Sequence, residues 1–244
     1  MNFTGKTALI TGSGTIGGLG HAVATVLAAG GAEVVITGTD SQRAGQVVDE
    51  ITGRGGRARF IEADLSDPAA VRRLADEAGP VDILINNAAV VPVAPTPQQE
   101  VTAYDTAFAV NTRAPFLLTA ALAPKMIANG GGSIVNLSSA AAKLGAPGQY
   151  VDYAAAKGGI ETFTIGLAKE LAGEGIRVNA VRPGIIDTEI HASGGTPDRV
   201  REITPQLPMK RAGTADEVGE AIVWLLSERS SYTTGSVVEV TGGR

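Results

Sequence analysis

The chain of 244 residues contains no cysteine, which excludes disulfide bonds, thiolate nucleophiles and cysteine-ligated metals. His21 and His191 are its only imidazoles, too few for a histidine-rich metal site, so we expect no metal. Aromatic residues make up 4% of the chain, so Val, Ile, Leu and Ala must fill any core. The absence of cysteine makes cytoplasmic residence the simplest prediction.

Basic charge and long apolar runs are also scarce. A net charge of −5 and a pI near 5.1 exclude the basic stripe that a nucleic-acid surface needs. No apolar run approaches the roughly 20 residues of a membrane span. The first six residues lack the basic and apolar regions of a signal peptide. We therefore expect neither nucleic acid nor a membrane as a partner.

Short apolar, β-branched runs alternate with longer helical patterns along the whole chain. Strands are predicted at Thr7–Thr11, Glu33–Thr37, Ala58–Glu62, Val81–Ile85, Ser133–Leu137, Arg177–Val181 and Val237–Val240. Helices are predicted near Gly18–Ala29, Ser41–Thr52, Pro68–Ala78, Val101–Val110, Arg113–Ala128, Asp152–Ala172 and Ala215–Leu226. Several strands are apolar at consecutive positions, which is typical of strands covered on both faces.

This alternation predicts an α/β fold: a doubly wound, Rossmann-type domain whose seven-stranded parallel sheet has helices on both faces. No linker or repeat divides the chain, so residues 1–244 are expected to form a single domain that both binds the dinucleotide and carries the chemistry. Residues 187–209, with their Ser193-Gly194-Gly195 turn, are expected to form a flexible substrate flap.

A glycine-rich loop follows the first predicted strand. It reads Thr11-Gly12-Ser13-Gly14-Thr15-Ile16-Gly17-Gly18-Leu19-Gly20 and leads into a helix. Glycines at such a place let the backbone approach a pyrophosphate seated on the positive end of the helix. The helical pattern starts late, so Gly18 and Gly20 are the expected glycines at the helix entry. The alternative, a merely flexible turn, is disfavoured by the strand before the loop and the helix after it.

The choice of cofactor depends on the end of the second strand, where an acid would bind the ribose 2′-hydroxyl of NAD. The discriminating positions, Gly38 and Thr39, are not acidic. Gly38 leaves space for a 2′-phosphate, with Thr39, Ser41 or Arg43 as donors, which favours NADP(H). Asp40 keeps NAD(H) open, unless it caps the next helix.

Tyr153 and Lys157 are four positions apart, so a helix places the phenol and the ammonium on one face. A free phenol has a pKa near 10 and is a poor acid–base catalyst at neutral pH, but a nearby cation stabilises the phenolate. Tyr153 can then give a proton to a carbonyl oxygen or take one from an alcohol. The alternative is a surface pair on a good helix former.

Ser138 and Ser139 end a strand predicted to be buried. A serine at the carboxyl end of such a strand faces the crevice where open α/β sheets bind ligands, and it can hold the substrate oxygen. Ser139 is preferred because choosing Ser138 lengthens the spacing to Tyr153. The alternative is local turn or cap chemistry.

Further motifs follow in a fixed order along the chain. Asp64-Leu65 comes after the third strand, Asn86-Asn87-Ala88-Ala89 after the fourth, then Asn111, and Pro183-Gly184-Ile185-Ile186-Asp187-Thr188 after the sixth. With the glycine loop, Ser139 and Tyr153-x-x-x-Lys157, they make the chain resemble the short-chain dehydrogenase/reductase family over essentially its whole length. Each motif alone is also typical of a turn or strand end, but their order is far more specific.

The resemblance implies a catalytic set. Tyr153 would be the general acid/base, and Ser139 would position the substrate carbonyl or alcohol. Lys157 would bind the nicotinamide ribose and lower the Tyr153 pKa, while Asn111 would hold a water that links Lys157 to solvent. The expected cofactor-binding residues are Gly12, Gly14, Gly18, Leu19, Gly20, Thr39, Asp64, Leu65, Asn86, Ala88, Tyr153, Lys157, Pro183, Gly184, Ile186 and Thr188.

The chain departs from the family pattern in three places. Five residues separate Gly12 from Gly18, where the family usually has three, which bears on the phosphate contacts. Ala89 stands where the family usually has glycine. Ser139 precedes Tyr153 by fourteen positions, at the long end for the family.

The main functional hypothesis is hydride transfer between a nicotinamide cofactor and a small sugar, polyol or ketone. Lys143, Gln149, Tyr150 and His191 are expected to supply polar groups to the substrate pocket, unless they face water. The resemblance also implies a homotetramer or homodimer, built with the helices at 152–172 and 215–226.

Two alternatives remain. A 3-oxoacyl-carrier-protein reductase needs a basic docking surface, for which Arg199, Arg201, Lys210 and Arg211 are the candidates. A non-catalytic dinucleotide sensor has no use for a proton donor, so the joint presence of Asn111, Ser139, Tyr153 and Lys157 argues against it.

Overall fold

The β-branched runs of the sequence form one sheet of seven parallel strands in the computed structural model, in the order β3-β2-β1-β4-β5-β6-β7. The structure describes residues 1–244, except for the side chains of His191 and Ser193. The strands are β1 (Thr7–Ile10), β2 (Glu33–Gly38), β3 (Arg57–Glu62), β4 (Ile83–Asn86), β5 (Gly132–Leu137), β6 (Ile176–Pro183) and β7 (Val237–Val240).

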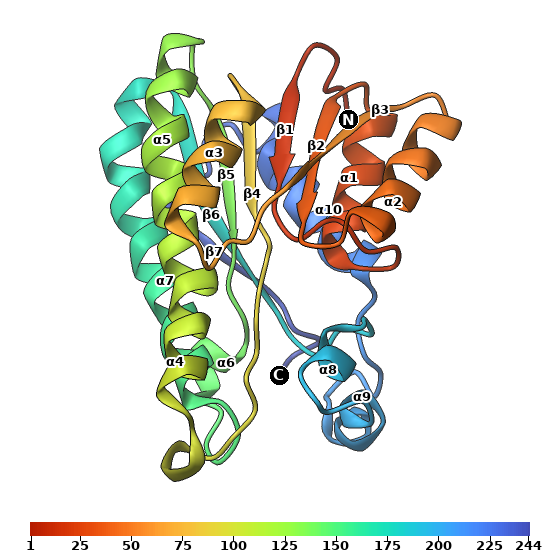
Figure 1. Ribbon diagram of the computed structural model, residues 1–244, viewed down its shortest axis with the longest axis vertical. Coiled ribbons are helices and arrows are strands. Elements are labelled where there is room, and N and C mark those ends of the chain that lie inside the picture. Colours follow the sequence, from red (N-terminus) through yellow and green to blue (C-terminus); the bar gives the residue numbers. More distant parts are fainter.

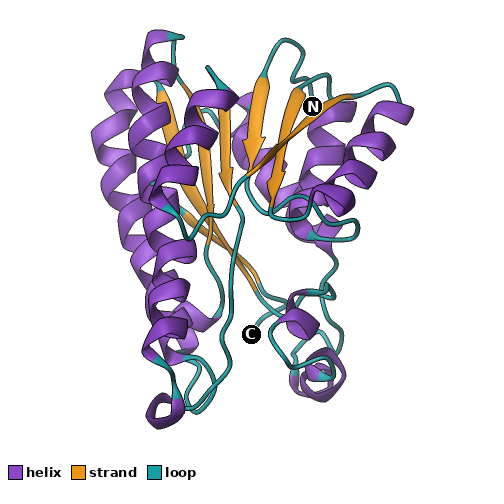
Figure 2. Cartoon of the chain, viewed as in Figure 1, coloured by secondary structure: helices purple, strands orange, loops and turns teal.

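Helices connect the strands and cover both faces of the sheet (Figures 1 and 2). The helices are α1 (Leu19–Ala29), α2 (Ser41–Gly53), α3 (Pro68–Ala78), α4 (Val101–Phe108), α5 (Ala114–Ala128), α6 (Ala141–Leu144), α7 (Val151–Leu171), α8 (Ile190–Ser193), α9 (Arg199–Ile203) and α10 (Ala215–Leu226). One-turn helical segments are η1 (Thr96–Gln98), η2 (Ala109–Arg113), η3 (Ala172–Glu174), η4 (Thr204–Gln206) and η5 (Glu228–Ser230). Figure 1 places α3, α5 and α7 on one side of the sheet and α1, α2 and α10 on the other.

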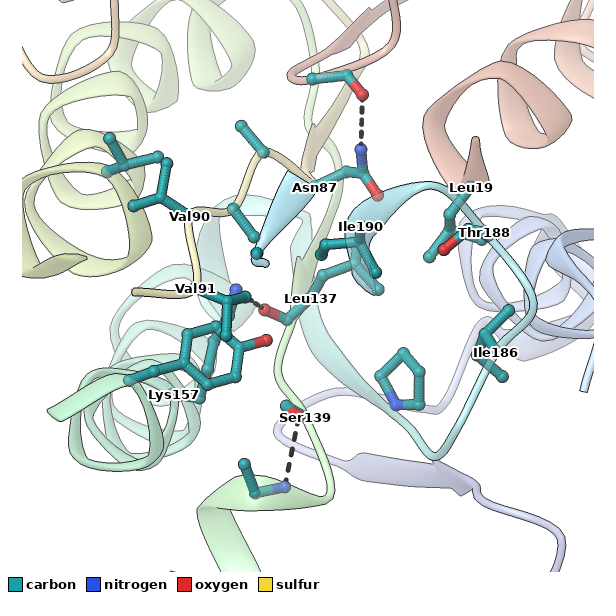
Figure 3. Close-up of a pocket in the computed structure, with 18 of the residues that line it drawn as sticks. Leu19, Asn87, Val90, Val91, Leu137, Ser139, Lys157, Ile186, Thr188 and Ile190 are labelled. Atoms are coloured by element: carbon teal, nitrogen blue, oxygen red, sulfur yellow. Dashed lines mark hydrogen bonds between the residues drawn. The ribbon is translucent and has the colours of Figure 1, made fainter. Parts of the chain in front are cut away.

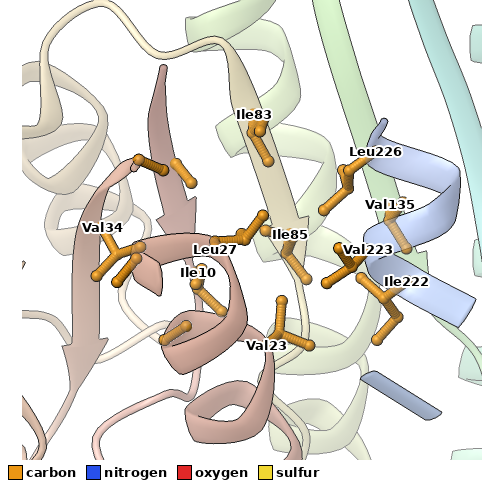
Figure 4. Close-up of a cluster of buried hydrophobic side chains, with 14 of the residues drawn as sticks. Ile10, Val23, Leu27, Val34, Ile83, Ile85, Val135, Ile222, Val223 and Leu226 are labelled. Atoms are coloured by element: carbon orange, nitrogen blue, oxygen red, sulfur yellow. The ribbon is translucent and has the colours of Figure 1, made fainter. Parts of the chain in front are cut away.

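Two cores follow from the alternation of side chains along each strand. In β1, Ile10 joins the core under α1 and α10, whereas its neighbour Leu9 joins the core under α3 and α5. The first core is drawn in Figure 4, where Val23 and Leu27 of α1 approach Ile222 and Val223 of α10. Aliphatic side chains supply nearly all of both cores, as the low aromatic content predicts.

The order of strands reverses at β1, whose neighbours are β2 and β4. In an open α/β sheet such a switch point leaves a crevice at the carboxyl ends of the strands. The segments α6, α8 and α9 lie beyond these ends (Figure 1). The fold therefore places the glycine loop, the end of β5 and the start of α7 around one space.

The predicted fold class is confirmed, with strand limits shifted by one or two residues. The helices predicted near Val101–Val110 and Arg113–Ala128 are continuous, because the backbone between them stays helical and widens into the π-helical turn η2. The helices α6, α8 and α9 were not predicted, since four or five residues are too few for a helical pattern. None of the helices in the described part of the chain combines the length and apolarity needed to cross a bilayer.

Candidate active site

A cavity of about 620 Å³ lies at the carboxyl ends of the central strands. Fourteen residues of the predicted site line it: Gly12, Gly18, Leu19, Thr39, Asp64, Leu65, Ala88, Ser139, Tyr153, Lys157, Pro183, Gly184, Ile186 and Thr188. Figure 3 shows Leu19, Ile186 and Thr188 on one side of the cavity and Val91 and Lys157 on the other. Gly14, Gly20, Asn86 and Asn111 are not among the residues that line the cavity.

The glycine loop brings bare backbone to the cavity. Gly12 has a φ of +63°, and a Cβ there would lie 2.7 Å from the Cα of Ala88, so only glycine fits. Gly18 is the N-cap of α1 and makes no side-chain cap hydrogen bond, as expected for the glycine at the helix entry. The positive end of α1 therefore faces the cavity at Gly18 and Leu19.

Gly14 and Gly20, also predicted to bind the cofactor, do not line the cavity, and both are closely packed. A Cβ on Gly14 would lie 3.1 Å from the Cβ of Ala44 in α2. A Cβ on Gly20 would lie 2.8 Å from the carbonyl oxygen of Gly12. The lengthened loop turns toward α2 before it enters α1, and small residues are needed at both contacts.

Asn86 and Asn111 support the cavity from behind rather than line it. Asn86 Nδ2 donates to Asn136 Oδ1 at 2.8 Å, which joins β4 to β5. Asn111 lies in η2 and donates through Nδ2 to the carbonyl oxygen of Val90 at 2.8 Å. The side-chain oxygens of both residues are buried with no hydrogen-bond partner among the described residues.

Tyr153 and Lys157 lie one helical turn apart near the start of α7, and both side chains are buried. The Lys157 Nζ is 5.7 Å from the centroid of the Tyr153 ring and donates to the carbonyl oxygen of Leu137 at 2.7 Å. Ser139 shares a hydrogen bond with the Tyr153 side chain. Ser138 instead donates to Glu161 Oε1 at 2.6 Å, which supports the choice of Ser139 on geometric grounds.

The protonation of the pair differs from the expectation. Burial raises the pKa of Tyr153 to about 12, and the hydrogen bond with Ser139 offsets only part of this. Burial also lowers the pKa of Lys157 to about 7. The resemblance implied that Lys157 lowers the pKa of Tyr153; in the ligand-free protein burial instead raises the pKa of Tyr153, and burial also lowers the pKa of Lys157. Tyr153 is protonated at neutral pH.

The residues after β2 favour NADP(H) over NAD(H) as the cofactor. Gly38, Thr39 and Arg43 line the cavity, and a Cβ on Gly38 would lie 3.9 Å from its nearest neighbours, an ordinary contact distance, so a side chain fits there without a clash. Asp40 does not line the cavity; it caps α2 by accepting from the Arg43 backbone N–H at 3.0 Å. Arg43 also forms an ion pair with Glu189, which joins α2 to the segment at 187–209.

Several residues of the site were missed or misplaced by sequence reasoning. Thr11 holds the loop after β4 by accepting from the backbone N–H of Asn87 at 2.9 Å and of Ala88 at 3.0 Å. Gln149 and Tyr150 line the cavity as predicted, whereas Lys143 forms an ion pair with Glu239 at 3.1 Å and does not. His191 was also predicted to supply a polar group to the pocket, but its side chain is outside the part of the structure that is described. Thr15, Val91, Val93, Leu144, Ile190 and Arg244 also line the cavity.

The cavity fits a dinucleotide. Its glycine-lined end offers backbone N–H groups and the positive end of α1 to a pyrophosphate, and Leu65 and Asp64 flank that end after β3. Its other end holds a protonated phenol beside a lysine and a serine, the groups that an alcohol or carbonyl needs for proton transfer.

Comparison with known proteins agrees with this geometry. The family model described as Enoyl-(Acyl carrier protein) reductase matches residues 14–244. The uncharacterized oxidoreductase YgfF of Escherichia coli is 43% identical, over 97% of this chain and 99% of its own. The 3-oxoacyl-[acyl-carrier-protein] reductase FabG of Escherichia coli is 34% identical, over 100% of this chain and 98% of its own. The structure of a gluconate 5-dehydrogenase from Burkholderia cenocepacia J2315, in complex with NADP and tartrate, matches with a TM-score of 0.90 and 32% identity, covering 99% of this chain and 96% of that one.

The chain belongs to the short-chain dehydrogenase/reductase family. It is a nicotinamide-dependent oxidoreductase that interconverts CH–OH and C=O groups.

Proposed function

We propose that the protein is an NADP(H)-dependent reductase of small ketones or oxo sugars, with Tyr153 as the general acid. The observation that carries this proposal is the buried, protonated Tyr153, hydrogen-bonded to Ser139 at the cavity beside Lys157. A phenol with a raised pKa holds its proton until a carbonyl oxygen gains negative charge, which suits Tyr153 to the role of general acid in reduction.

The chain's own residues orient the substrate and move the proton. Ser139 and Tyr153 donate hydrogen bonds to the carbonyl oxygen, and Tyr153 releases its proton to that oxygen as the alcohol forms. A nicotinamide bound in the cavity would supply the hydride for the carbonyl carbon. Lys157 would hold the cofactor ribose, and the side-chain oxygen of Asn111, which has no partner among the described residues, would accept from a water through which the phenolate regains a proton.

NADP(H) is proposed because Gly38 leaves room for a 2′-phosphate beside Thr39 and Arg43. A guanidinium is well suited to bind a phosphate through paired hydrogen bonds. Asp40, the residue that kept NAD(H) open, is used as the cap of α2. The NADP in the gluconate 5-dehydrogenase relative supports the same choice.

A 3-oxoacyl-carrier-protein reductase is the second candidate, because a relative carries that name. The surroundings of the four basic residues that could form its docking surface argue against it. Arg199 is buried, Arg201 pairs with Asp198 at 3.0 Å, and Arg211 pairs with Glu217 at 2.6 Å. Lys210 donates through Nζ to the carbonyl oxygen of Pro205 at 3.0 Å. These four residues therefore form no open basic patch for an acidic carrier.

We also propose a homotetramer or homodimer. The apolar side chains of α10 are used in the core, but Val101 and Tyr104 of α4, Phe116 of α5, and Val151 and Ile165 of α7 are exposed. This apolar surface supports assembly through α4, α5 and α7.

Cytoplasmic residence and a flap that moves stay predictions from the sequence.

The test is turnover with NADPH against NADH on a panel of ketones, oxo sugars and acyl thioesters, for the wild type and Tyr153→Phe. We expect faster turnover with NADPH, and in Tyr153→Phe a loss of kcat on the order of 10²- to 10⁴-fold with NADPH binding retained. Wild-type rates in Tyr153→Phe would refute the mechanism. Tight NADPH binding without turnover of any compound would instead indicate a sensor.

A further inference from the structure

Arg199 is the feature of the cavity that the proposed function does not use. It is the first residue of α9, within the segment 187–209, and it lines the same cavity as Tyr153. Arg199 as a whole residue is only 8% exposed. The guanidinium donates through Nη2 to the hydroxyl of Tyr150 and lies 5.1 Å from the centroid of that ring.

Nothing in the described part of the chain neutralises this buried cation. The ion pairs of the described side chains include Arg201 with Asp198 on the same short helix, but none involves Arg199. The acidic side chains that line the cavity are Asp64 and Glu189. Asp64 accepts from the Ser66 backbone N–H at 2.8 Å, and Glu189 is paired with Arg43.

A buried guanidinium without a counter-ion is costly, and arginine remains charged at any physiological pH. An anion that enters the cavity would remove this cost and gain a charge-assisted pair. Tyr150 links this cation to the catalytic end of the cavity, because its ring packs edge-on against Tyr153 with centroids 5.7 Å apart. An anion bound to Arg199 would therefore lie at the Tyr153 end of the cavity.

We propose that Arg199 binds a carboxylate of the substrate, so that the enzyme reduces oxo acids in preference to neutral carbonyl compounds. Tyr150 is a positioning residue that holds the guanidinium toward the cavity. This inference rests on the proposed function, since it names the substrate class of the same site.

The experiment uses matched pairs of compounds: 2-oxobutanoate, 3-oxobutanoate and 4-oxopentanoate, each with its ethyl ester. The three acids place the carboxylate at increasing distance from the reacting carbonyl, and each ester removes the charge while keeping that carbonyl. Oxidation of NADPH is followed for the wild type, Arg199→Met, Arg199→Lys and the control Arg201→Met, which changes an exposed arginine of the same helix.

We expect the wild type to favour at least one acid over its ester by about tenfold or more in kcat/KM. Arg199→Met should lower kcat/KM for that acid by about 30-fold or more and change the ester by less than about threefold. Arg199→Lys should restore part of the loss, and Arg201→Met should behave as the wild type.

The outcomes separate the two proposals. Wild-type reduction of the esters with no preference for any acid would overturn the carboxylate proposal and leave the reductase intact. An equal loss for acid and ester in Arg199→Met would show that Arg199 is structural. Failure to reduce any acid, ester, ketone or oxo sugar would overturn the reductase itself.

Discussion

Lys157 shows how strongly burial changes the chemistry of a single residue. Its amine is surrounded by α7 and the end of β5, and its one described hydrogen bond goes to the carbonyl oxygen of Leu137. The desolvation that lowers its pKa to about 7 also makes its charge a cost to the folded state.

The lowered pKa of Lys157 predicts how the stability of the protein depends on pH. Between pH 7 and about 10.5 the unfolded chain binds more protons at Lys157 than the folded chain, so this residue's contribution to stability rises as the pH rises. The free energy of unfolding of the wild type, relative to Lys157→Met, should increase by about 3 kcal/mol from pH 7 to pH 10 in urea denaturation. Lys169→Met, which removes an exposed lysine of the same helix, should show no such trend. A flat difference for Lys157→Met would mean that its amine is well solvated.

Gly38 is predicted to decide between the two cofactors. Gly38→Asp fits without a clash, since a Cβ there has no neighbour nearer than 3.9 Å, and its charge would repel a 2′-phosphate. The ratio of kcat/KM for NADPH to that for NADH should fall by about 10- to 100-fold. Gly38→Asn, which adds the same bulk without the charge, should change the ratio far less. An unchanged ratio in Gly38→Asp would place the 2′-phosphate elsewhere.

Arg43 should affect the same ratio, because its substitution removes an attraction for the 2′-phosphate where Gly38→Asp adds a repulsion. Removing the guanidinium in Arg43→Gln should raise the KM for NADPH by about tenfold or more and leave the KM for NADH nearly unchanged. Glu189→Gln frees Arg43 from its ion pair and should leave or lower the KM for NADPH. Equal effects of Arg43→Gln on both cofactors would show that it supports the fold around α2 rather than the phosphate.

At the scale of elements, the packing of α1 against the glycine loop sets the phosphate end of the cavity. Gly20→Ala would place a Cβ 2.8 Å from both the Gly12 carbonyl oxygen and the Ser13 Cα, so α1 must move away. We expect a loss of about 1–3 kcal/mol in the free energy of unfolding together with weaker NADPH binding, measured by denaturation and fluorescence titration.

The control lies on the neighbouring helix. A Cβ on Gly45 of α2 meets nothing within 4 Å, so Gly45→Ala should be neutral or stabilise by up to about 1 kcal/mol and keep NADPH binding. If Gly20→Ala matched this control in both measurements, the close approach of α1 to the loop would be unimportant.

At the scale of the whole molecule, the exposed apolar surface of α4, α5 and α7 is the expected subunit interface. Phe116 of α5 packs against Phe163 of α7 with ring centroids 5.8 Å apart, yet the residue stays 53% exposed. Phe116→Glu should lower the mass measured by light scattering after gel filtration, because a buried carboxylate would oppose association. Tyr232→Glu, on a fully exposed residue outside these helices, should keep the wild-type mass. An unchanged mass for Phe116→Glu would place the interface on another face.

The sequence by itself determined the fold class, because strand and helix periodicities are local and parallel crossovers have one handedness. The resemblance of its motifs to the short-chain dehydrogenase/reductase family also implied a set of site residues, and fourteen of them line the cavity. The spacing of Tyr153 and Lys157 needed nothing beyond the period of a helix.

The tertiary structure decided what depends on contacts between distant segments. Gly14 and Gly20 belong to packing rather than to the cavity because α2 and the loop lie against them. The raised pKa of Tyr153 comes from burial by residues far along the chain, which no spacing in the sequence reveals. The charge of Arg199 is of the same kind, since only the folded structure shows that no described side chain forms an ion pair with it.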